Sequence, residues 1–254
     1  MHSPATPPLT WLDPEEPFPP VTESWGPDSP APGLLAAGAS LDVWRLKAAY
    51  ASGIFPWFSQ GQPILWWSPD PRMVLFPGEF KLHRSLRKTI QRFRTLPSCE
   101  VRIDSDFSAV IRACSGTARR GQNSTWIVPS MIEAYEQLHA AGTAHSVETW
   151  VDGRLVGGLY CISIGRAVFG ESMFAHASDA SKVALAALVG LCRTQGVGMI
   201  DCQQNTAHLA SLGGREIPRA QFLDNVMRAR GDEEFDWRFK PAYWDSLLNS
   251  APNA

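Results

Sequence analysis

The sequence of 254 residues has no apolar run of about 18 residues, which argues against a membrane-spanning helix. Its start lacks the basic segment and apolar centre of a secretory signal peptide. The five cysteines form no Cys-x-x-Cys pair, so we expect free thiols in a reducing compartment. The six histidines show no ligand spacing such as His-Glu-x-x-His. These absences predict a cytoplasmic globular protein without a membrane anchor or a metal site.

Positive charge is missing from residues 1–32, which hold five acids, ten of the twenty prolines and neither Lys nor Arg. Residues 232–254 are also acidic, with five acids against two bases. The body between them, residues 33–231, carries 21 bases and 15 acids, so the net charge of −2 conceals a basic centre. That distribution is compatible with a polyanionic partner.

Residues 53–71, which we call the aromatic loop, place several large aromatic side chains on a backbone made stiff by prolines. It contains four prolines, which exclude a continuous helix or central strand. Such a segment suits either a shaped binding surface or a buried plug at one end of a core, and the residues alone leave both open. Its five aromatic residues are Phe55, Trp57, Phe58, Trp66 and Trp67.

Hydrophobic periodicity predicts helices and strands in nearly equal measure. We expect helices over residues 40–52, 81–94, 130–142, 179–195, 208–212 and 218–230. We expect strands over residues 73–76, 145–151, 154–163, 166–174 and 198–203. The order of helix, three antiparallel strands, helix and strand predicts an α+β, or mixed α/β, fold.

The expected organisation has four parts. Residues 1–32 form a Pro-rich acidic extension, packed in its later part by Trp11 and Phe18. Residues 33–70 form a small N-terminal domain that contains the aromatic loop. Residues 71–231 form a larger domain, and residues 232–254 form an acidic tail.

The predicted helix over residues 81–94 combines an apolar side with six bases and no acid. A solvated helix face usually mixes charges of both signs. The pattern therefore favours contact with phosphates over simple solvation, with a solvated face as the alternative. The apolar side consists of Leu82, Leu86, Ile90 and Phe93.

Three polar residues lie within apolar strand patterns. Asp201 and Gln203 alternate with Ile200 and Cys202, so we expect the two polar side chains on one face. A solvent face, or an Asp that caps a loop, is the alternative. Glu171 must be paired or hydrogen-bonded if it is buried, and it either anchors the fold or binds a cation or an amine.

Ten segments of the sequence form a series of motifs in one order: residues 53–58, 63–72, 85–88, 144–150, 155–160, 169–174, 179–182, 200–203, 208–213 and 216–219. Together they resemble the leucyl/phenylalanyl-tRNA–protein transferase family. The resemblance extends over about residues 11–228 and implies a larger domain similar to GCN5-type acetyltransferases. It implies transfer of Leu, Phe or sometimes Met from tRNA to a protein that begins with Arg or Lys, which marks that protein for degradation.

The resemblance also implies site residues. Catalytic positions fall on Asp201, Gln203 and Glu171. We expect Asp201 to accept or guide the amine proton, and Gln203 to hold the substrate carbonyl or the side chain of Asp201. We expect Glu171 to face the cationic acceptor. The partners are aminoacyl-tRNA and the acceptor protein, no cofactor is expected, and a monomer is the default. An aminoacyl pocket is implied near Trp57, Trp126, Tyr135 and Tyr50, and tRNA contact at Arg84, Arg87, Lys88 and Arg92.

Within the aromatic loop, we expect Trp57 to contact substrate and Trp66 and Trp67 to pack the junction between the domains. Two other functions compete with the main interpretation. An acyl-CoA-dependent N-acetyltransferase would need a glycine-containing pyrophosphate loop, which residues 172–181 lack. A non-catalytic RNA-binding protein would leave the polar strand residues unexplained.

Overall fold

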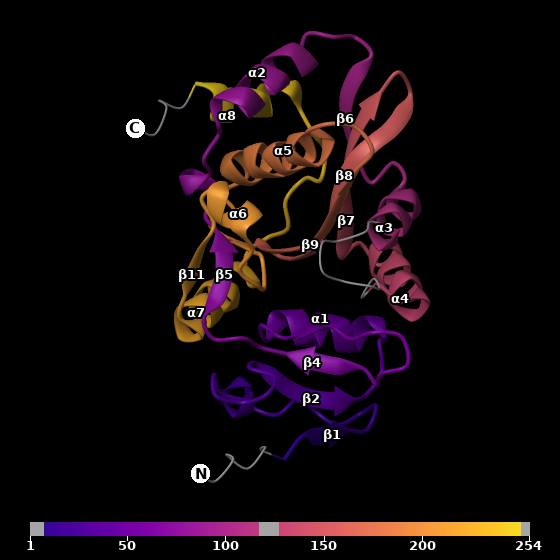
Figure 1. Ribbon diagram of the computed structural model, residues 1–254, viewed down its shortest axis with the longest axis vertical. Helices are drawn as coiled ribbons and strands as arrows, with labels where there is room; N and C mark the ends of the chain where they lie inside the picture. The colour runs from indigo at the N-terminus through magenta and orange to yellow at the C-terminus, as the bar shows by residue number, and fades with distance from the viewer. Residues whose placement is uncertain (1–7, 117–126, 250–254) are drawn as a thin grey trace.

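The computed structural model describes residues 8–116 and 127–249 and contains two sheets that lie one above the other in Figure 1. The N-terminal sheet has four strands in the order β1-β2-β4-β3. The larger sheet has seven strands in the order β11-β5-β10-β9-β8-β7-β6. Helices alternate with these strands, so the predicted mixed α/β fold with a separate N-terminal unit is confirmed.

The N-terminal sheet joins segments far apart in the sequence. β1 (Thr10–Leu12) runs parallel to β2 (Leu34–Gly38), and β4 (Leu65–Trp67) pairs antiparallel with both β2 and β3 (Phe55–Pro56). The helix α1 (Val43–Ala51) lies between this sheet and the larger one (Figure 1). The aromatic loop therefore supplies two strands, and the acidic extension supplies a third.

The larger sheet is built around an antiparallel meander. Its strands are β5 (Arg72–Leu75), β6 (Cys99–Ile103), β7 (Ala144–Val151), β8 (Arg154–Ile164), β9 (Ala167–Ala175), β10 (Ile200–Asp201) and β11 (Arg215–Ile217). β6 to β9 pair antiparallel, whereas β10 runs parallel to β9 and antiparallel to β5. A parallel neighbour requires a crossover, which helix α5 (Ala180–Thr194) provides.

Helix α5 is almost entirely apolar because other elements cover it on both sides. It packs on β7, β8 and β9, and its outer side contacts helix α2 (Arg84–Phe93) and the C-terminal helix α8 (Asp245–Leu248). A helix that is apolar all round must be buried in this way. The acidic tail thus contains a core segment, in which Tyr243, Trp244 and Leu247 are buried.

The remaining helices are α3 (Phe107–Ser115) and α4 (Pro129–Ala140), which lie on the side of the sheet away from α5, and α6 (Ala207–Ser211) and α7 (Arg219–Ala229) (Figure 1). Single 3₁₀ turns occur at Val21–Glu23, Pro77–Glu79 and Pro241–Trp244. In the described part of the chain, no helix is long and apolar enough to cross a membrane.

Several local expectations are wrong for physical reasons. The strand predicted over residues 198–203 shortens to two residues, because Gln203 takes a left-handed φ of 55° that a strand cannot contain. Trp11, expected to pack the acidic extension, is 64% exposed, and Trp44 of α1 is 52% exposed. α4 begins at Pro129, one residue before the expected start at residue 130, because proline suits the first helical position.

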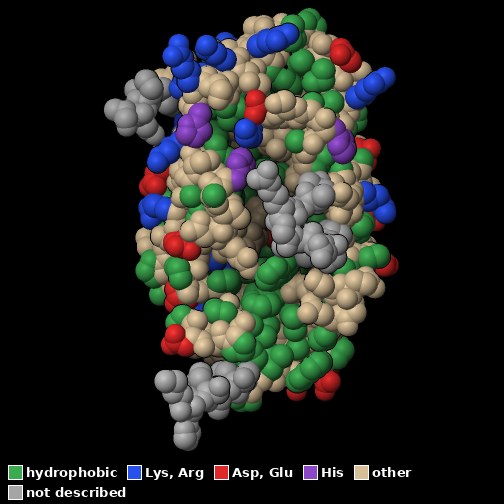
Figure 2. Space-filling view, in the orientation of Figure 1, with side chains coloured by type: hydrophobic (Ala, Val, Ile, Leu, Met, Phe, Trp, Pro, Cys, Tyr) green, Lys and Arg blue, Asp and Glu red, His purple; other side chains and the backbone are tan. Residues whose placement is uncertain are grey.

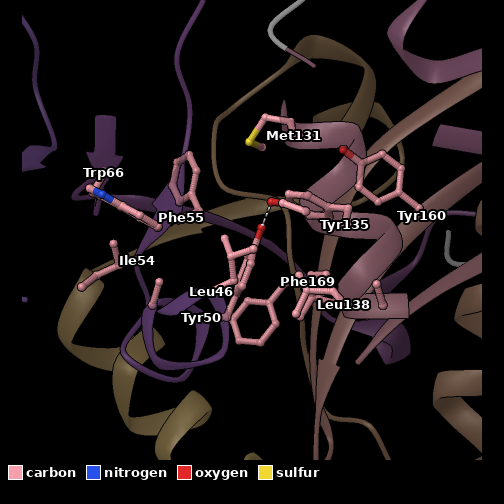
Figure 3. Close-up of a cluster of buried hydrophobic side chains, with 14 of the residues drawn as sticks. Leu46, Tyr50, Ile54, Phe55, Trp66, Met131, Tyr135, Leu138, Tyr160 and Phe169 are labelled. Atoms are coloured by element: carbon pink, nitrogen blue, oxygen red, sulfur yellow. Dashed lines mark hydrogen bonds between the residues drawn. The ribbon is translucent and has the colours of Figure 1, made fainter. Parts of the chain in front are cut away.

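One hydrophobic cluster crosses the junction between the two units. Tyr50 of α1 packs against Phe169 of β9 with ring centroids 5.2 Å apart, and Phe55 and Tyr135 belong to the same cluster (Figure 3). Trp66, predicted at this junction, instead packs within the N-terminal unit. Its ring contacts Phe18 edge to face at 4.8 Å, and its indole N–H donates to the carbonyl of residue 38 at 3.0 Å.

Candidate active site

A cavity of about 590 Å³ opens where β3 of the N-terminal sheet meets the larger sheet. Figure 2 shows the surface hollowed at this level. The cavity is lined by residues of β3, β8, β9, β10, α5 and α6, so its walls come from segments spread over about 150 residues. A cleft of this size between two units, with few polar groups, is typical of a small-ligand site.

The inner part of the cavity is apolar, and we call it the apolar lobe. Two of its members, Leu185 and Leu188, come from α5, where residues three apart share a face. No charged side chain belongs to this set, so the lobe suits a branched aliphatic or aromatic group. The members of the apolar lobe are Leu159, Met173, Leu185, Leu188 and Ile200.

Glu171 of β9 supplies the carboxyl group on the cavity wall. Its Oε1 accepts hydrogen bonds from the Tyr50 hydroxyl at 2.8 Å and the Gln203 side-chain amide at 3.0 Å, and its Oε2 accepts one from the Tyr135 hydroxyl at 3.4 Å. The two tyrosine hydroxyls also bond to one another, as Figure 3 shows. The carboxyl is therefore fixed in place while one side faces the cavity.

Burial raises the pKa of Glu171 to about 8, against opposing hydrogen bonds from the two tyrosines. The nearby negative charge of Asp201 acts in the same direction as burial. Burial likewise raises the pKa of Tyr50 and of Tyr135 well above the ordinary value, so both stay neutral donors. A carboxyl with a pKa near 8 can exchange a proton at physiological pH.

Asp201 lies behind the cavity rather than on its wall. Its two carboxylate oxygens accept hydrogen bonds from Nε and Nη2 of Arg72 at 2.8 and 2.6 Å, and both side chains are essentially buried. Oδ1 also accepts the backbone N–H of Gln203 at 2.9 Å. Both carboxylate oxygens are thus occupied by donors, and the role expected of Asp201, to accept or to guide the amine proton, stays a prediction.

The expected alternation of Asp201 and Gln203 on one face is wrong. β10 ends at Asp201, and the left-handed backbone of Gln203 turns its side chain toward Glu171 and the cavity. Gln203 thus links the two carboxyl groups, since its backbone binds one and its side chain binds the other. Ile200 and Cys202, expected on the opposite face, line the cavity with it.

The residues predicted for the aminoacyl pocket divide into three groups. Trp57 lines the cavity together with Phe55. Tyr50 and Tyr135 are fully buried and reach the cavity only through Glu171. Trp126 lies outside the described residues. Trp67 packs edge to face on Trp57 at 5.3 Å and donates its N–H to the Trp57 carbonyl, so it supports that wall.

The four predicted tRNA contacts all lie on α2, at the end of the molecule where Figure 2 shows Lys and Arg side chains gathered. Arg84, Lys88 and Arg92 are exposed. Arg87 is half-buried, and its Nη1 donates to the carbonyl of Leu248 at the end of α8 at 2.6 Å. Arg87 therefore ties the C-terminal segment to α2 and is less free than the other three to bind a phosphate.

Arg72 and the members of the apolar lobe were not expected from the sequence. Arg72 stands in an apolar strand, and the rule that singled out Glu171 applies to it equally, because a buried charge demands a partner. The guanidinium also stacks on Phe55 and Phe222, with centroid distances of 4.7 and 4.5 Å. The lobe residues gave no comparable signal, since their pattern is that of any core strand or helix.

Fold and cavity together define a mixed α/β protein whose largely apolar cavity carries, within the described residues, one carboxyl on its wall, that of Glu171 with a raised pKa. The family model described as leucyl/phenylalanyl-tRNA protein transferase matches residues 74–227, and the model of its N-terminal domain matches residues 39–70. The chain belongs to the leucyl/phenylalanyl-tRNA–protein transferase family.

Relatives named leucyl/phenylalanyl-tRNA–protein transferase match nearly the whole chain. The one from Polaromonas sp. is 60% identical over 96% of this chain and 95% of its own length. The one from Burkholderia pseudomallei is 57% identical over 97% of this chain and 96% of its own. A GCN5-related N-acetyltransferase from Kribbella flavida aligns with 67% of this chain and 59% of its own, at 12% identity and a TM-score of 0.33, which carries no further argument.

Proposed function

We propose that this protein transfers Leu or Phe, and also Met, from the 3′ end of its tRNA to the N-terminal amine of an acceptor protein. The observation that carries the proposal is the cavity in which an uncharged apolar lobe adjoins the carboxyl of Glu171. The names of the family and of its relatives support the same reaction. The proposal further includes acceptors that begin with Arg or Lys, a role in marking them for degradation, and a cytoplasmic location.

In this proposal, the apolar lobe holds the side chain of the transferred amino acid. A hydrophobic pocket gains only about 1–3 kcal/mol from one methylene group, so it tolerates Leu, Phe and Met together. A charged side chain would lose its hydration among Leu159, Leu185 and Leu188 without gaining a partner. Trp57, on the wall formed by β3, offers an aromatic surface to the adenosine that follows the aminoacyl group.

The reaction is aminolysis of an ester. The acceptor nitrogen attacks the aminoacyl carbonyl carbon, a C–N bond forms, and the C–O bond to the terminal ribose breaks. The amine loses a proton and the ribose oxygen gains one, so atoms and charge balance without an added reactant. The ester is already activated, and the protein contributes mainly by holding the two reactants in attack geometry.

We assign the amine proton to Glu171 rather than to Asp201. The pKa of Glu171, about 8, matches the ordinary pKa of an α-amine, about 7.7–8.0, so the proton passes between them at little cost in free energy. Gln203 and Tyr50 hold Oε1 and leave the carboxyl no freedom to rotate away. At pH 7 this carboxyl is mostly protonated, which makes it a weak counter-ion for the acceptor's Arg or Lys side chain.

The decisive experiment is transfer of radiolabelled Leu from charged tRNA to a peptide that begins with Arg. We expect labelled peptide with the Arg peptide and none with a matched peptide that begins with Asp. A parallel reaction with acetyl-coenzyme A in place of the charged tRNA tests the N-acetyltransferase alternative, which predicts acetylated peptide. Binding of charged tRNA without transfer to any peptide would overturn the proposal in favour of a non-catalytic RNA-binding protein.

A further inference from the structure

The cavity face of α5 continues beyond the apolar lobe to a lysine. Leu188, Leu185 and Lys182 follow one another at intervals of three residues, which places Lys182 about 4.5 Å further along the helix axis than Leu185, at 1.5 Å per residue. Its ammonium lies 2.8 Å from Oδ1 of Asp179, and its side chain is 41% exposed. A solvent-accessible positive charge thus lies at the end of the row that lines the lobe.

His208 of α6 lies at the mouth of the same cavity. Its side chain is exposed, and its pKa is lowered by partial burial and by the positive charge of Lys182. The two side chains, one from α5 and one from α6, therefore lie within electrostatic reach of each other. Among the charged groups that the structure describes here, Asp179 is the carboxylate that opposes them.

Two basic groups close enough to repel one another are stabilised when an anion enters between them. Lysine is a common point-charge partner for phosphate, and an imidazole donates a hydrogen bond in either protonation state. The order of groups along the proposed substrate is side chain, ester, ribose and phosphate. His208 lines the same cavity as the apolar lobe, Glu171 and Gln203, and Lys182 lies one helical turn from Leu185 of the lobe.

We propose that Lys182 and His208 form a phosphate site that binds the phosphodiester on the 5′ side of the terminal adenosine of the aminoacyl-tRNA. This inference rests on the proposed function, because it assumes that the aminoacyl end occupies the cavity. The phosphate site would determine how deeply the terminal nucleotide enters the cavity. It would thereby set the position of the ester relative to Glu171. Its residues belong to α5 and α6, whereas the basic residues predicted for tRNA contact belong to α2.

Two short substrates test the inference without the rest of the tRNA. Phenylalanyl-adenosine carries no phosphate, and the phenylalanyl ester of cytidylyl-adenosine carries one, at the position in question. For Lys182→Gln we expect KM for the dinucleotide to rise about tenfold, the loss of about 1.4 kcal/mol, with kcat nearly unchanged. We expect both constants for phenylalanyl-adenosine to stay at the wild-type level.

Matched variants make the result specific. Lys182→Arg keeps the charge and should restore KM for the dinucleotide, and His208→Gln should raise it by a smaller factor. Lys47→Gln removes an exposed lysine from α1 in the N-terminal unit and should change neither substrate. An equal effect of Lys182→Gln on both substrates, or no effect on either, would overturn the phosphate site.

A binding measurement separates this inference from the proposed function. Calorimetry should give tighter binding of cytidylyl-adenosine than of adenosine to the wild-type protein, and Lys182→Gln should remove the difference. The slope of log K against log salt should fall by about 0.7 in the variant, the value for one single-strand phosphate contact. If the wild type transfers nothing, the proposed function fails. If the two ligands bind equally, the phosphate site fails.

Discussion

Two carboxyl groups close to β10 have opposite environments. Asp201 accepts hydrogen bonds from the Arg72 guanidinium and from a backbone N–H, donors that stabilise its negative charge. It lies behind the cavity. Glu171 faces two tyrosines and an amide, and it lies on the cavity wall with a pKa raised to about 8. In our proposal Asp201 is an anchor that holds Arg72, and Glu171 is the reactive group, because its pKa of about 8 lies near the working pH.

Gln203 connects the two carboxyl groups through hydrogen bonds. Its backbone N–H binds Asp201 and its side-chain amide binds Glu171. The position of Asp201 therefore determines where Gln203, the hydrogen-bond partner of Glu171, lies. Loss of the anchor should therefore disturb both folding and catalysis, whereas loss of Glu171 should mainly slow catalysis and alter stability only as pH changes. The predictions below test that division.

The largest expected effect is on the rate of the Glu171→Gln variant. The amide keeps the shape of the side chain but cannot take the amine proton, and general base catalysis contributes about 10²–10⁴-fold. We expect single-turnover transfer from Leu-tRNA to fall by that factor, while the circular dichroism spectrum at the assay pH shows the same fold as the wild type. A loss of less than tenfold would contradict the assignment.

The second expected effect concerns stability. Asp201→Asn leaves the buried Arg72 guanidinium without its countercharge, and breaking a buried ion pair on one side costs about 3–5 kcal/mol. Denaturant unfolding should show a correspondingly lower free energy of unfolding. A variant that unfolds like the wild type yet transfers at least 100-fold more slowly would return Asp201 to the catalytic group.

A paired substitution sharpens this test. Asp201→Leu with Arg72→Met removes both charges together, and apolar replacement of a buried ion pair is often neutral or stabilising. We expect the double variant to be more stable than Asp201→Asn and to regain part of its transfer activity. An inactive double variant of wild-type stability would show that the ion pair has a direct chemical role.

Glu171 should also give the wild type a pH-dependent stability that Glu171→Gln lacks. The folded state holds the Glu171 proton up to a pKa of about 8, whereas the unfolded state releases it near 4.5. Between these values the folded state binds more protons, so the stability of the wild type relative to the variant should fall as pH rises from 4.5 to 8 and then level off. At about 1.4 kcal/mol per pKa unit, the total is a few kcal/mol. Thermal denaturation of both proteins across this range measures it, and a constant difference would contradict the raised pKa.

The sequence predicted most of the larger sheet because its strands alternate or run apolar between clear turns. β7, β8 and β9 and the helices α2, α5 and α7 were expected within a few residues of where they lie. β1, β2 and β6 were not expected, since short strands are defined by their neighbours more than by their own residues. α1 was expected over residues 40–52, but the sequence did not show that Trp44 is exposed and that the buried side includes Arg45, which donates to the carbonyls of Pro14 and Glu16.

Of the residues predicted for the site, Glu171, Gln203 and Trp57 line one cavity, and their roles there stay predictions. Glu171 and Gln203 were singled out as polar residues in apolar strand patterns, whereas Trp57 came from the family resemblance. The separation of Asp201 from Gln203 depends on one left-handed residue, and nothing in the residue type of a glutamine predicts that backbone. The link from Tyr50 and Tyr135 to Glu171 joins positions 121 and 36 residues apart, which periodicity cannot reveal.

The apolar lobe offers a prediction of intermediate size. Leu188→Ala enlarges the lobe on its α5 side and removes contacts to the transferred side chain. We expect kcat/KM for Leu transfer to fall about 10–100-fold, which corresponds to about 1–3 kcal/mol, and Phe transfer to fall less because the larger ring fills the space. Competition between the two charged tRNAs in one reaction measures the ratio, and an unchanged ratio would place the side chain elsewhere.

The smallest expected effects divide the basic residues of α2. Arg84→Gln and Lys88→Gln remove exposed charges, so each should weaken tRNA binding a fewfold and lower the slope of log K against log salt by about 1. Arg87→Gln instead removes a hydrogen bond to the Leu248 carbonyl, so it should lower the free energy of unfolding by about 1–2 kcal/mol and change the salt slope less. Filter binding at several salt concentrations, with denaturant unfolding beside it, measures both quantities. Because Arg87 holds the C-terminal segment against α2, a salt slope for Arg87→Gln equal to that for Lys88→Gln would show that this segment leaves the helix when tRNA binds.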